Sequence, residues 1–491
     1  MPLIPFGEYR PDVSDYEGQA TRNIRNVIPR GDGYGPFPGL STYTTALPSA
    51  CRGAFYALKS DGTVITFAGT SDKLYRLNNT DFSWIDVSKG GGTYIAPTFG
   101  GQVANWQFAQ FGNLVFATHA NTVLQVFDLS LSGAFADCAG SPPQAAYISV
   151  IGRFLVLSGL LSNQYRIHWS GLNATTTWES GTNSSDYQDF PDGGVVRGVA
   201  GGEHGIIFQD QAIRRMSYVP GSPLIFQIDR ITQDKGLYAP YSIVRAGEKI
   251  FFYAGQGFHK IEPGGVPEQI GREKVDRTFL ADLDKSNLQL FIGAADPRST
   301  RVYWAYKSVS GAVGTVYDKL LGYDFLLDRF FPVSVTGEYL LGVSQTGLTL
   351  ENLDSISSSL DALTLSLDAY ATAVQPEIGQ FDGSHALGFF RGANLEATME
   401  SAEQGTDENR LIIRGFRPVT DALALYGSVS YRDTPSAPSA SADEVAVNTR
   451  TGRCDLMRDT RYSRFKVRIP AATTWTFCAG VVPDLTTGGT L

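Results

Sequence analysis

The amino-acid sequence predicts an all-β protein in which a six- or seven-bladed β-propeller is followed by a C-terminal antiparallel β-sandwich. Three observations support this prediction. A strand–turn–strand pattern recurs along the first two thirds of the chain, several of its strands are apolar on both faces, and the sequence changes character after about residue 378. Helical periodicity is almost absent.

The recurring pattern is an apolar strand, a short polar turn and a second apolar strand that carries Arg, Gln or Lys. Clear copies occupy residues 64–77, 113–127, 154–169, 204–218 and 249–262, and fainter copies follow at 301–307 and 339–352. Their spacing of about 40 to 50 residues is the period of four-stranded propeller blades. The number of blades stays open between six and seven, because the last copies are faint and the N-terminal segment could complete one.

Several strands of these copies are apolar without interruption, as in residues 114–116, 154–157, 206–208 and 250–253. Strands with one face in solvent would alternate between apolar and polar residues. Inner strands of propeller blades are covered by a neighbouring blade on each side, which explains continuous apolarity without helices. We therefore expect the propeller to span residues 51–353.

The segments that flank the repeats differ in composition. Residues 1–50 are rich in Gly, Pro and Asn and predict an extended N-terminal arm, which in a propeller often supplies the outer or closing strand of the last blade. Aromatic residues within this arm favour docking over disorder. Residues 354–377 are predicted as a linker, with a short amphipathic helix over 355–370 as the alternative. Residues 378–491 are expected to form the β-sandwich.

Composition limits the classes of function. The net charge of −9 argues against non-specific electrostatic binding of nucleic acid. The four cysteines are far apart and predict reduced structural thiols rather than a zinc site or a disulfide framework, although pairing of Cys454 with Cys478 stays open. The N-terminus lacks an export signal, and the longest apolar run is too short to span a membrane, so a soluble protein is expected.

Motifs for catalysis or cofactor binding are weak. The five histidines lack metal-binding spacing, and neither a nucleophile elbow nor a P-loop is present. Asp186, Asp189 and Asp192 are close enough in sequence to bind calcium or to serve as acid and base, but an acidic turn is the simpler interpretation. The sequence therefore predicts a protein that is not an enzyme and has no cofactor and no metal.

A basic stretch near the C-terminus stands out, because the chain as a whole is acidic. Arg464, Lys466 and Arg468 alternate with apolar residues, so the three cations should share one face of a strand. One interpretation is a solvated edge strand whose charges prevent unwanted pairing. The other is a cationic interface between subunits, with the acidic 186–192 turn as a candidate complement. A nucleic-acid groove ranks third because aromatic stacking residues are missing.

Three segments resemble the tail hub, or nozzle, proteins of short-tailed bacteriophages, also called packaged-DNA stabilisation proteins. GYGPFPGLSTY at residues 33–43 is similar to that family's N-terminal FPG turn. Residues 189–219 resemble its central PDG phrase with the strands that follow, and residues 461–482 resemble its closing strands. The three segments occur in the family's order and span nearly the whole chain.

The resemblance implies a structural virion protein of the tail, assembled in the host cytoplasm. It implies a homohexameric ring below the portal and its head-to-tail adaptor, which continues the DNA channel and anchors a tail fibre or tailspike, with a tail needle or plug as a further candidate partner. DNA would pass without sequence-specific binding. Which surface lines the channel stays open.

Two other classes of function compete with this one. A propeller-type glycosidase or carbohydrate-binding tail component would place acidic residues and tryptophans in one pocket. Trp169 and Trp178 are candidates for stacking on a sugar, although packing in the core or between blades explains them equally well. A cellular propeller scaffold is the third possibility, for which the arm and the sandwich would be unusual additions.

Overall fold

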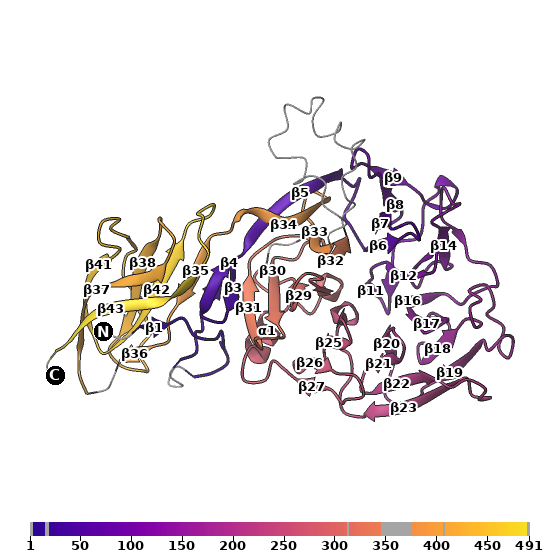
Figure 1. Ribbon diagram of the computed structural model, residues 1–491. Coiled ribbons are helices and arrows are strands. Elements are labelled where there is room, and N and C mark those ends of the chain that lie inside the picture. The colour runs from indigo at the N-terminus through magenta and orange to yellow at the C-terminus, as the bar shows by residue number, and fades with distance from the viewer. Residues whose placement is uncertain (1–2, 15–18, 312–313, 345–375, 406–407, 489–491) are drawn as a thin grey trace.

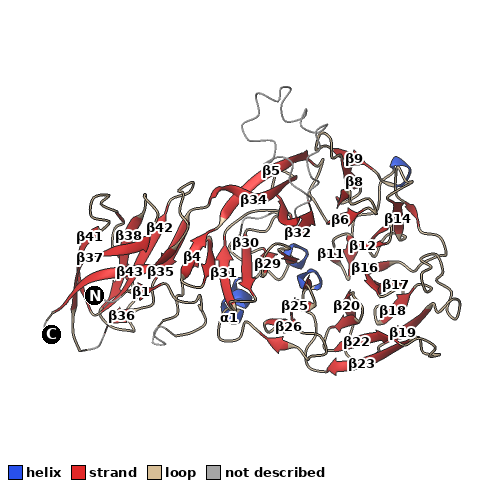
Figure 2. Cartoon of the chain, in the orientation of Figure 1, coloured by secondary structure: helices blue, strands red, loops and turns tan. Residues whose placement is uncertain are grey.

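The computed structural model describes residues 3–14, 19–311, 314–344, 376–405 and 408–488 (Figure 1). This part of the chain is nearly all β. It contains one short α-helix, α1 (Asp276–Asp282), and three 3-10 helices, η1 (Lys89–Gly91), η2 (Pro240–Ser242) and η3 (Leu288–Leu290) (Figure 2). The expected linker, and the helix considered as its alternative, lie outside the described residues apart from residues 376–377.

Seven sheets of the described chain have four antiparallel strands each, and in the first six the strands follow one another in chain order. The first sheet consists of β6 (Ala54–Leu58), β7 (Val64–Gly69), β8 (Leu74–Leu77) and β9 (Trp84–Asp86). The second consists of β12 (Gln107–Phe111), β13 (Leu114–Thr118), β14 (Gln125–Asp128) and β15 (Ala136–Asp137). The third consists of β16 (Ala145–Ile151), β17 (Phe154–Leu160), β18 (Arg166–Trp169) and β19 (Asp186–Asp189). The fourth sheet consists of β20 (Val196–Ala200), β21 (Gly205–Gln209), β22 (Ile213–Tyr218) and β23 (Phe226–Thr232). The fifth consists of β24 (Val244–Ala246), β25 (Lys249–Tyr253), β26 (Phe258–Ile261) and β27 (Glu268–Gln269). The sixth consists of β28 (Ile292–Ala295), β29 (Arg301–Tyr306), β30 (Lys319–Asp324) and β31 (Arg329–Val333).

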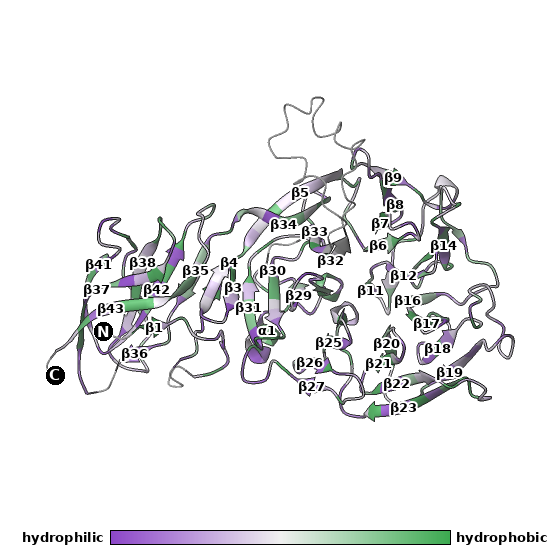
Figure 3. Cartoon of the chain, viewed as in Figure 1, coloured by the Kyte–Doolittle hydropathy of each residue, from purple (hydrophilic) through white to green (hydrophobic). Residues whose placement is uncertain are grey.

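These sheets are arranged in a propeller-like ring (Figure 1). The first strands of most consecutive sheets contact each other, and β32 of the last sheet contacts β6 of the first, so the first strands lie innermost. The second strands are the most apolar: every residue of β17 and β21 is buried, as expected for strands covered on both faces. Figure 3 shows hydrophobic residues along strands such as β30 and hydrophilic residues on α1.

The seventh sheet combines the two ends of the ring. It consists of β32 (Tyr339–Ser344), β33 (Pro376–Phe381), β34 (Ala386–Asn394) and β5 (Pro38–Ala46). The N-terminal segment thus supplies the outer strand of the last sheet, the role predicted for it from the sequence. Tyr43 of β5 fixes this position through ring contacts with Phe389 and Phe82, at centroid distances of 5.0 and 4.7 Å.

Two larger sheets form a second unit at the opposite end of the molecule from β14 and β19 (Figure 1). The first contains β1 (Ile4–Pro5), β3 (Val27–Arg30), β4 (Gly33–Pro36), β37 (Leu411–Thr420), β41 (Cys454–Thr460) and β43 (Cys478–Thr487). The second contains β2 (Ile24–Arg25), β35 (Ala397–Glu400), β36 (Gln404–Gly405), β38 (Tyr426–Arg432), β39 (Ala440–Ser441), β40 (Val445–Ala446) and β42 (Tyr462–Ile469). Their side chains meet in one core, where Phe416 and Phe465 pack edge to face at 5.3 Å.

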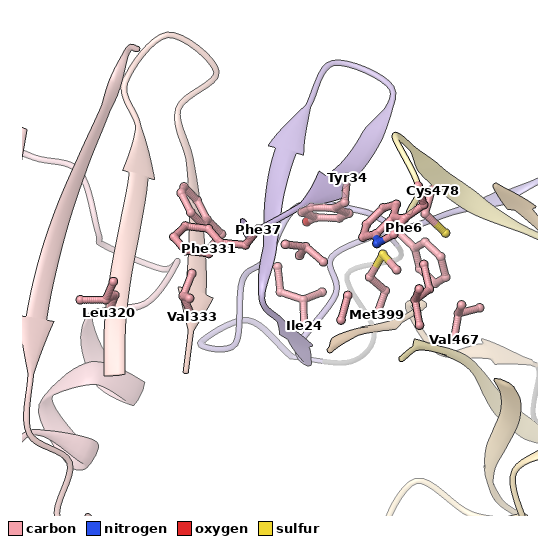
Figure 4. Close-up of a cluster of buried hydrophobic side chains, with 14 of the residues drawn as sticks. Phe6, Ile24, Tyr34, Phe37, Leu320, Phe331, Val333, Met399, Val467 and Cys478 are labelled. Atoms are coloured by element: carbon pink, nitrogen blue, oxygen red, sulfur yellow. The ribbon is translucent and has the colours of Figure 1, made fainter. Parts of the chain in front are cut away.

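The N-terminal segment lies between the ring and this second unit (Figure 4). Ile24, Tyr34 and Phe37 pack between Phe331 of β31 on one side and Met399 of β35 on the other. All five side chains are at most 3% exposed. One hydrophobic core therefore continues from the ring through the N-terminal segment into the larger sheets.

Candidate functional site

The basic strand predicted from the sequence is β42, and its alternation is confirmed. Phe465, Val467 and Ile469 are completely buried, while the side chains of Arg464, Lys466 and Arg468 lie partly exposed on the opposite face. However, β42 pairs with β35 and β36 on one side and with β38 on the other. The interpretation as an edge strand is therefore wrong, because both hydrogen-bonding edges of β42 are occupied.

The cations of β42 have acidic partners within the chain. Arg468 contacts Glu396 at 3.1 Å and Glu444 at 2.7 Å. Longer contacts join Lys466 to Glu444 at 3.9 Å and Arg464 to Glu403 at 3.7 Å. The face is therefore one of mixed charge, and a partner would meet alternating Arg, Lys and Glu side chains rather than an uncompensated cationic strip.

The acidic residues of the 186–192 segment are held separately. Both oxygens of Asp189 accept hydrogen bonds from the Arg166 guanidinium, at 2.6 and 2.9 Å, and this interaction lowers the pKa of Asp189. Asp192 contacts Arg214 at 2.8 Å, which likewise lowers the pKa of its carboxyl. Asp186 accepts a hydrogen bond from the Ser180 hydroxyl at 2.5 Å.

The three carboxylates therefore do not converge on one site. Across the described ranges, no group of three or more His, Cys, Asp or Glu side chains is placed to hold a metal ion. The interpretation of residues 186–192 as an acid–base or calcium site thus has no geometric support. This segment, beginning at β19, and strand β42 lie at opposite ends of the molecule (Figure 1), so the two candidate interface surfaces do not meet within one copy.

The tryptophans considered for sugar stacking are buried. Trp169 and Trp178 are 2% and 4% exposed, and their indole N–H groups donate hydrogen bonds to the carbonyls of Ser184 and Thr175, each at 2.9 Å. Neither ring face is available to a ligand, so packing, the alternative to sugar stacking, accounts for these two tryptophans.

All four cysteines are buried and unpaired. Cys454 and Cys478, whose pairing the sequence left open, are therefore free thiols. Burial raises the pKa of Cys138 and Cys454 to about 11 and that of Cys478 to about 12, and it also raises the pKa of Cys51. These thiols are unreactive core residues, because the thiolate is the nucleophilic form.

The central space of the ring is small and lined by tyrosines. A cavity of about 210 Å³ lies among the innermost strands, with Gln107 of β12, Ile292 of β28 and Tyr339 of β32 in its wall. Tyr241 of η2 reaches into this cavity, and its hydroxyl accepts a hydrogen bond from the Asn105 N–H at 2.9 Å. A nucleic-acid duplex cannot pass through a space of this size.

A larger cavity of about 550 Å³ lies at one end of this central space and shares Tyr147, Pro240 and Tyr241 with it. We call it the mouth pocket. Its remaining wall includes the hairpin of β10 (Thr98–Phe99) and β11 (Gln102–Val103), the pair Arg197–Asp210, and the connections around Tyr238 and Gln289. Nothing in the sequence indicated this pocket, because its residues come from strands and connections spread over almost two hundred positions.

A third cavity, of about 500 Å³, lies between the ring and the second larger sheet. Lys466 and Arg25 line it from the sheet, and Asp282, Tyr306 and Lys319 line it from the ring. Asp282 accepts hydrogen bonds from the Tyr306 hydroxyl at 3.0 Å and the Lys319 ammonium at 2.7 Å. The predicted interface residue Lys466 thus faces a polar cleft between the two units.

Comparison with known proteins identifies no family. No protein-family model and no curated protein matches the chain. Solved structures with a similar course include the computationally designed Ika8 protein, at 9% identity over 79% of this chain and 99% of that one, with a TM-score of 0.36. A chain of the mitotic checkpoint complex covers 76% of this chain and 95% of its own at 10% identity, with a TM-score of 0.37. A quinonprotein alcohol dehydrogenase-like protein from Bacteroides thetaiotaomicron has 10% identity over 57% and 66%, with a TM-score of 0.34. Likenesses of this size carry no argument about function.

No helix in the described part of the chain has the length and apolarity needed to cross a bilayer.

Proposed function

We propose that this chain is a seven-bladed β-propeller joined to a β-sandwich, and that it serves as the tail hub, or nozzle, of a short-tailed bacteriophage. In this proposal six copies form a ring below the portal and its adaptor. The ring continues the DNA channel and anchors the tail fibre or tailspike. The seven four-stranded sheets are the blades, and the two larger sheets are the sandwich.

The observation that carries the proposal is the route of the N-terminal segment. Its strands β1 to β4 belong to the larger sheets, and β5 belongs to the ring. The FPG turn that resembles the hub family lies at residues 37–39, where the chain crosses from one unit to the other, and Phe37 is buried in the shared core. A protein that transmits force between a capsid and its tail needs units that do not move independently, and a shared core supports that requirement.

The other two segments of the resemblance also occupy structural positions. Residues 461–482 contain β42 and the start of β43, one central strand in each larger sheet. Residues 189–219 run from the end of β19 to the end of β22 in the ring. The family likeness therefore follows the framework of the fold and includes no cluster of catalytic side chains.

A closed ring of identical subunits joined head to tail needs two different complementary surfaces on each copy. The mixed-charge face of β42 and the 186–192 segment are the candidates, and their location at opposite ends suits a contact between different copies. Since the central space of each copy is too small for a duplex, DNA in this proposal passes between the copies. A net charge of −9 per copy disfavours tight binding of the DNA phosphates.

Electron microscopy of the purified chain mixed with its adaptor ring tests the proposal. We expect six-fold rings stacked coaxially on the adaptor, with an axial opening wide enough for a duplex. Particles that stay separate from the adaptor, or rings of another symmetry, would count against the hub assignment.

A further inference from the structure

The mouth pocket combines strands and connections from consecutive sheets into one concave site. Tyr147 comes from β16, Arg197 from β20, Asp210 from the turn between β21 and β22, and Tyr238 from the connection before β24. Its volume of about 550 Å³ lies within the range of small-molecule sites, and the pocket opens at the end of the ring rather than into the core. The site is therefore built jointly by several consecutive sheets of the ring, as ligand sites at the ends of closed β structures are.

A charged pair and a phenol form the polar part of the pocket. The Nε of Arg197 donates to Oδ1 of Asp210 at 2.6 Å, and Oδ2 of Asp210 accepts the Val195 N–H at 3.0 Å. Both Asp210 oxygens are thus engaged. Arg197 makes no other hydrogen bond within the described residues, so its terminal N–H groups remain as donors. Tyr147 is 6% exposed and lies close enough for both charges to influence its hydroxyl.

Aromatic and amide side chains complete the wall. Tyr238 is 38% exposed, so one large ring is accessible to a ligand, while Tyr241 is half-buried and its ring lies edge to face with that of Tyr147, at 6.3 Å. Phe99 of the β10–β11 hairpin packs edge to face on Tyr147 at 5.8 Å, which fixes the hairpin over the pocket. Gln102 and Gln211 are exposed and line the pocket with unengaged amides.

We propose that the mouth pocket binds a saccharide. An exposed tyrosine offers the flat apolar face on which a sugar ring stacks, and the guanidinium and amide groups supply donors and acceptors for its hydroxyls. A multiply charged anion fits less well, because Asp210 compensates Arg197 and Lys285 is then the one cation of the lining without an acidic partner among the described residues. This proposal does not depend on the hub assignment.

Saturation-transfer NMR with the full chain tests it, using N-acetylglucosamine, galactose and glucuronate as probes. The expected result is transfer to at least one probe, with the affinity reduced tenfold or more by Tyr238→Ala and severalfold by Gln211→Ala. The matched control is Tyr165→Ala, which removes a 45% exposed tyrosine from the outside of the ring and should leave binding unchanged. Preference for glucuronate would assign Lys285 a role, and preference for the neutral sugars would leave the amides as the selective groups.

Two outcomes would overturn the proposal. One is the absence of transfer to all three probes. The other is binding that Tyr238→Ala and Gln211→Ala leave intact, because the sugar would then bind elsewhere. Thermal unfolding of each variant checks that the fold is kept, and Gln211→Ala, which alters only an exposed side chain, keeps the test valid if Tyr238→Ala does not fold.

Discussion

The carboxylate of Asp12 caps helix α1 from the far N-terminus of the chain. Its Oδ1 accepts hydrogen bonds from the Thr278 N–H at 2.9 Å and from the Thr278 hydroxyl at 2.7 Å, and its Oδ2 accepts the Arg277 N–H at 2.8 Å. These N–H groups belong to the first turn of α1 and have no partner inside the helix. The cap therefore attaches the N-terminal segment to the ring at a point independent of β5.

Removal of this cap should destabilise the protein. We expect Asp12→Ala to lower the free energy of unfolding by about 1 kcal/mol, the usual cost of losing an N-cap. Urea unfolding measures this change. The matched control is Asp32→Ala, which removes a carboxylate that is 73% exposed in the same segment. Equal losses in the two variants would mean that the Asp12 hydrogen bonds do not stabilise the docked segment.

A buried carboxyl in the ring should make stability depend on pH. Burial raises the pKa of Asp276 to about 6, although its oxygens accept the Phe258 N–H at 3.0 Å and the Gln269 amide at 2.9 Å. Gly257 and Gly271 leave space for this carboxyl, since a Cβ at either position would overlap it. The native state binds more protons than the unfolded state between about pH 4 and pH 6, so stability falls as the pH rises through this range.

Asp276→Asn removes this proton linkage. We expect the variant to be more stable than the wild type by about 1 to 3 kcal/mol at pH 8, because two pKa units correspond to roughly that energy. The difference should shrink as the pH falls from about 6 to about 4. Urea unfolding across this range measures it, with Asp32→Asn as the exposed control. A difference that stays constant with pH would show that Asp276 does not titrate as inferred.

Glu338 joins the last sheet of the ring to the first. It is 2% exposed, and its oxygens accept the Cys51 N–H at 2.9 Å and lie 2.6 Å from Nδ1 of His385. Glu338→Ala should cost about 1 to 3 kcal/mol, since it leaves a buried donor without an acceptor. Glu338→Gln keeps an acceptor for Cys51 and should cost less. Thermal unfolding that ranks the two variants the other way would contradict this role.

Charge reversal tests the candidate interface. If the face of β42 contacts another copy, Arg464→Glu, Lys466→Glu and Arg468→Glu together should reduce the fraction of rings severalfold. Because these residues have partners within the chain, the control must also break internal ion pairs. Arg410→Glu does so on the first larger sheet, where Arg410 contacts Asp459 at 2.9 Å and Asp433 at 3.3 Å. Sedimentation velocity measures assembly, and unchanged rings in the triple variant would exclude this face.

The cysteines should be inaccessible in the native protein. All four are buried, so a thiol reagent is expected to react slowly with the folded chain and to titrate four thiols after denaturation without reductant. Fewer than four thiols in the denatured protein would mean that a disulfide is present.

The strands that sequence could predict are those covered on both faces. The first five copies of the repeat became the second and third strands of their sheets, such as β17 with β18, because burial there demands continuous apolar residues. Fourth strands such as β9 and β19 were missed because they are short and mostly lie at the surface. The copy at residue 339 differs, since it begins the first strand of the last sheet, which explains its faintness.

The candidate site was harder to predict than the fold. The alternation of β42 followed from spacing alone, but its central place in a sheet depends on β35 and β38, which are remote in sequence. The acidic partners Glu396 and Glu444 could not be predicted either, because they too are distant in sequence from the cations they contact. Neither the Asp12 cap nor the mouth pocket has a local signal, because each is created by contacts between distant segments.

The mass of the purified protein in solution, measured alone and then with its adaptor ring, tests the central claim most directly. The hub proposal predicts a hexamer, or a monomer that becomes hexameric only on the adaptor. A monomer that keeps its mass in the presence of the adaptor would contradict the proposal.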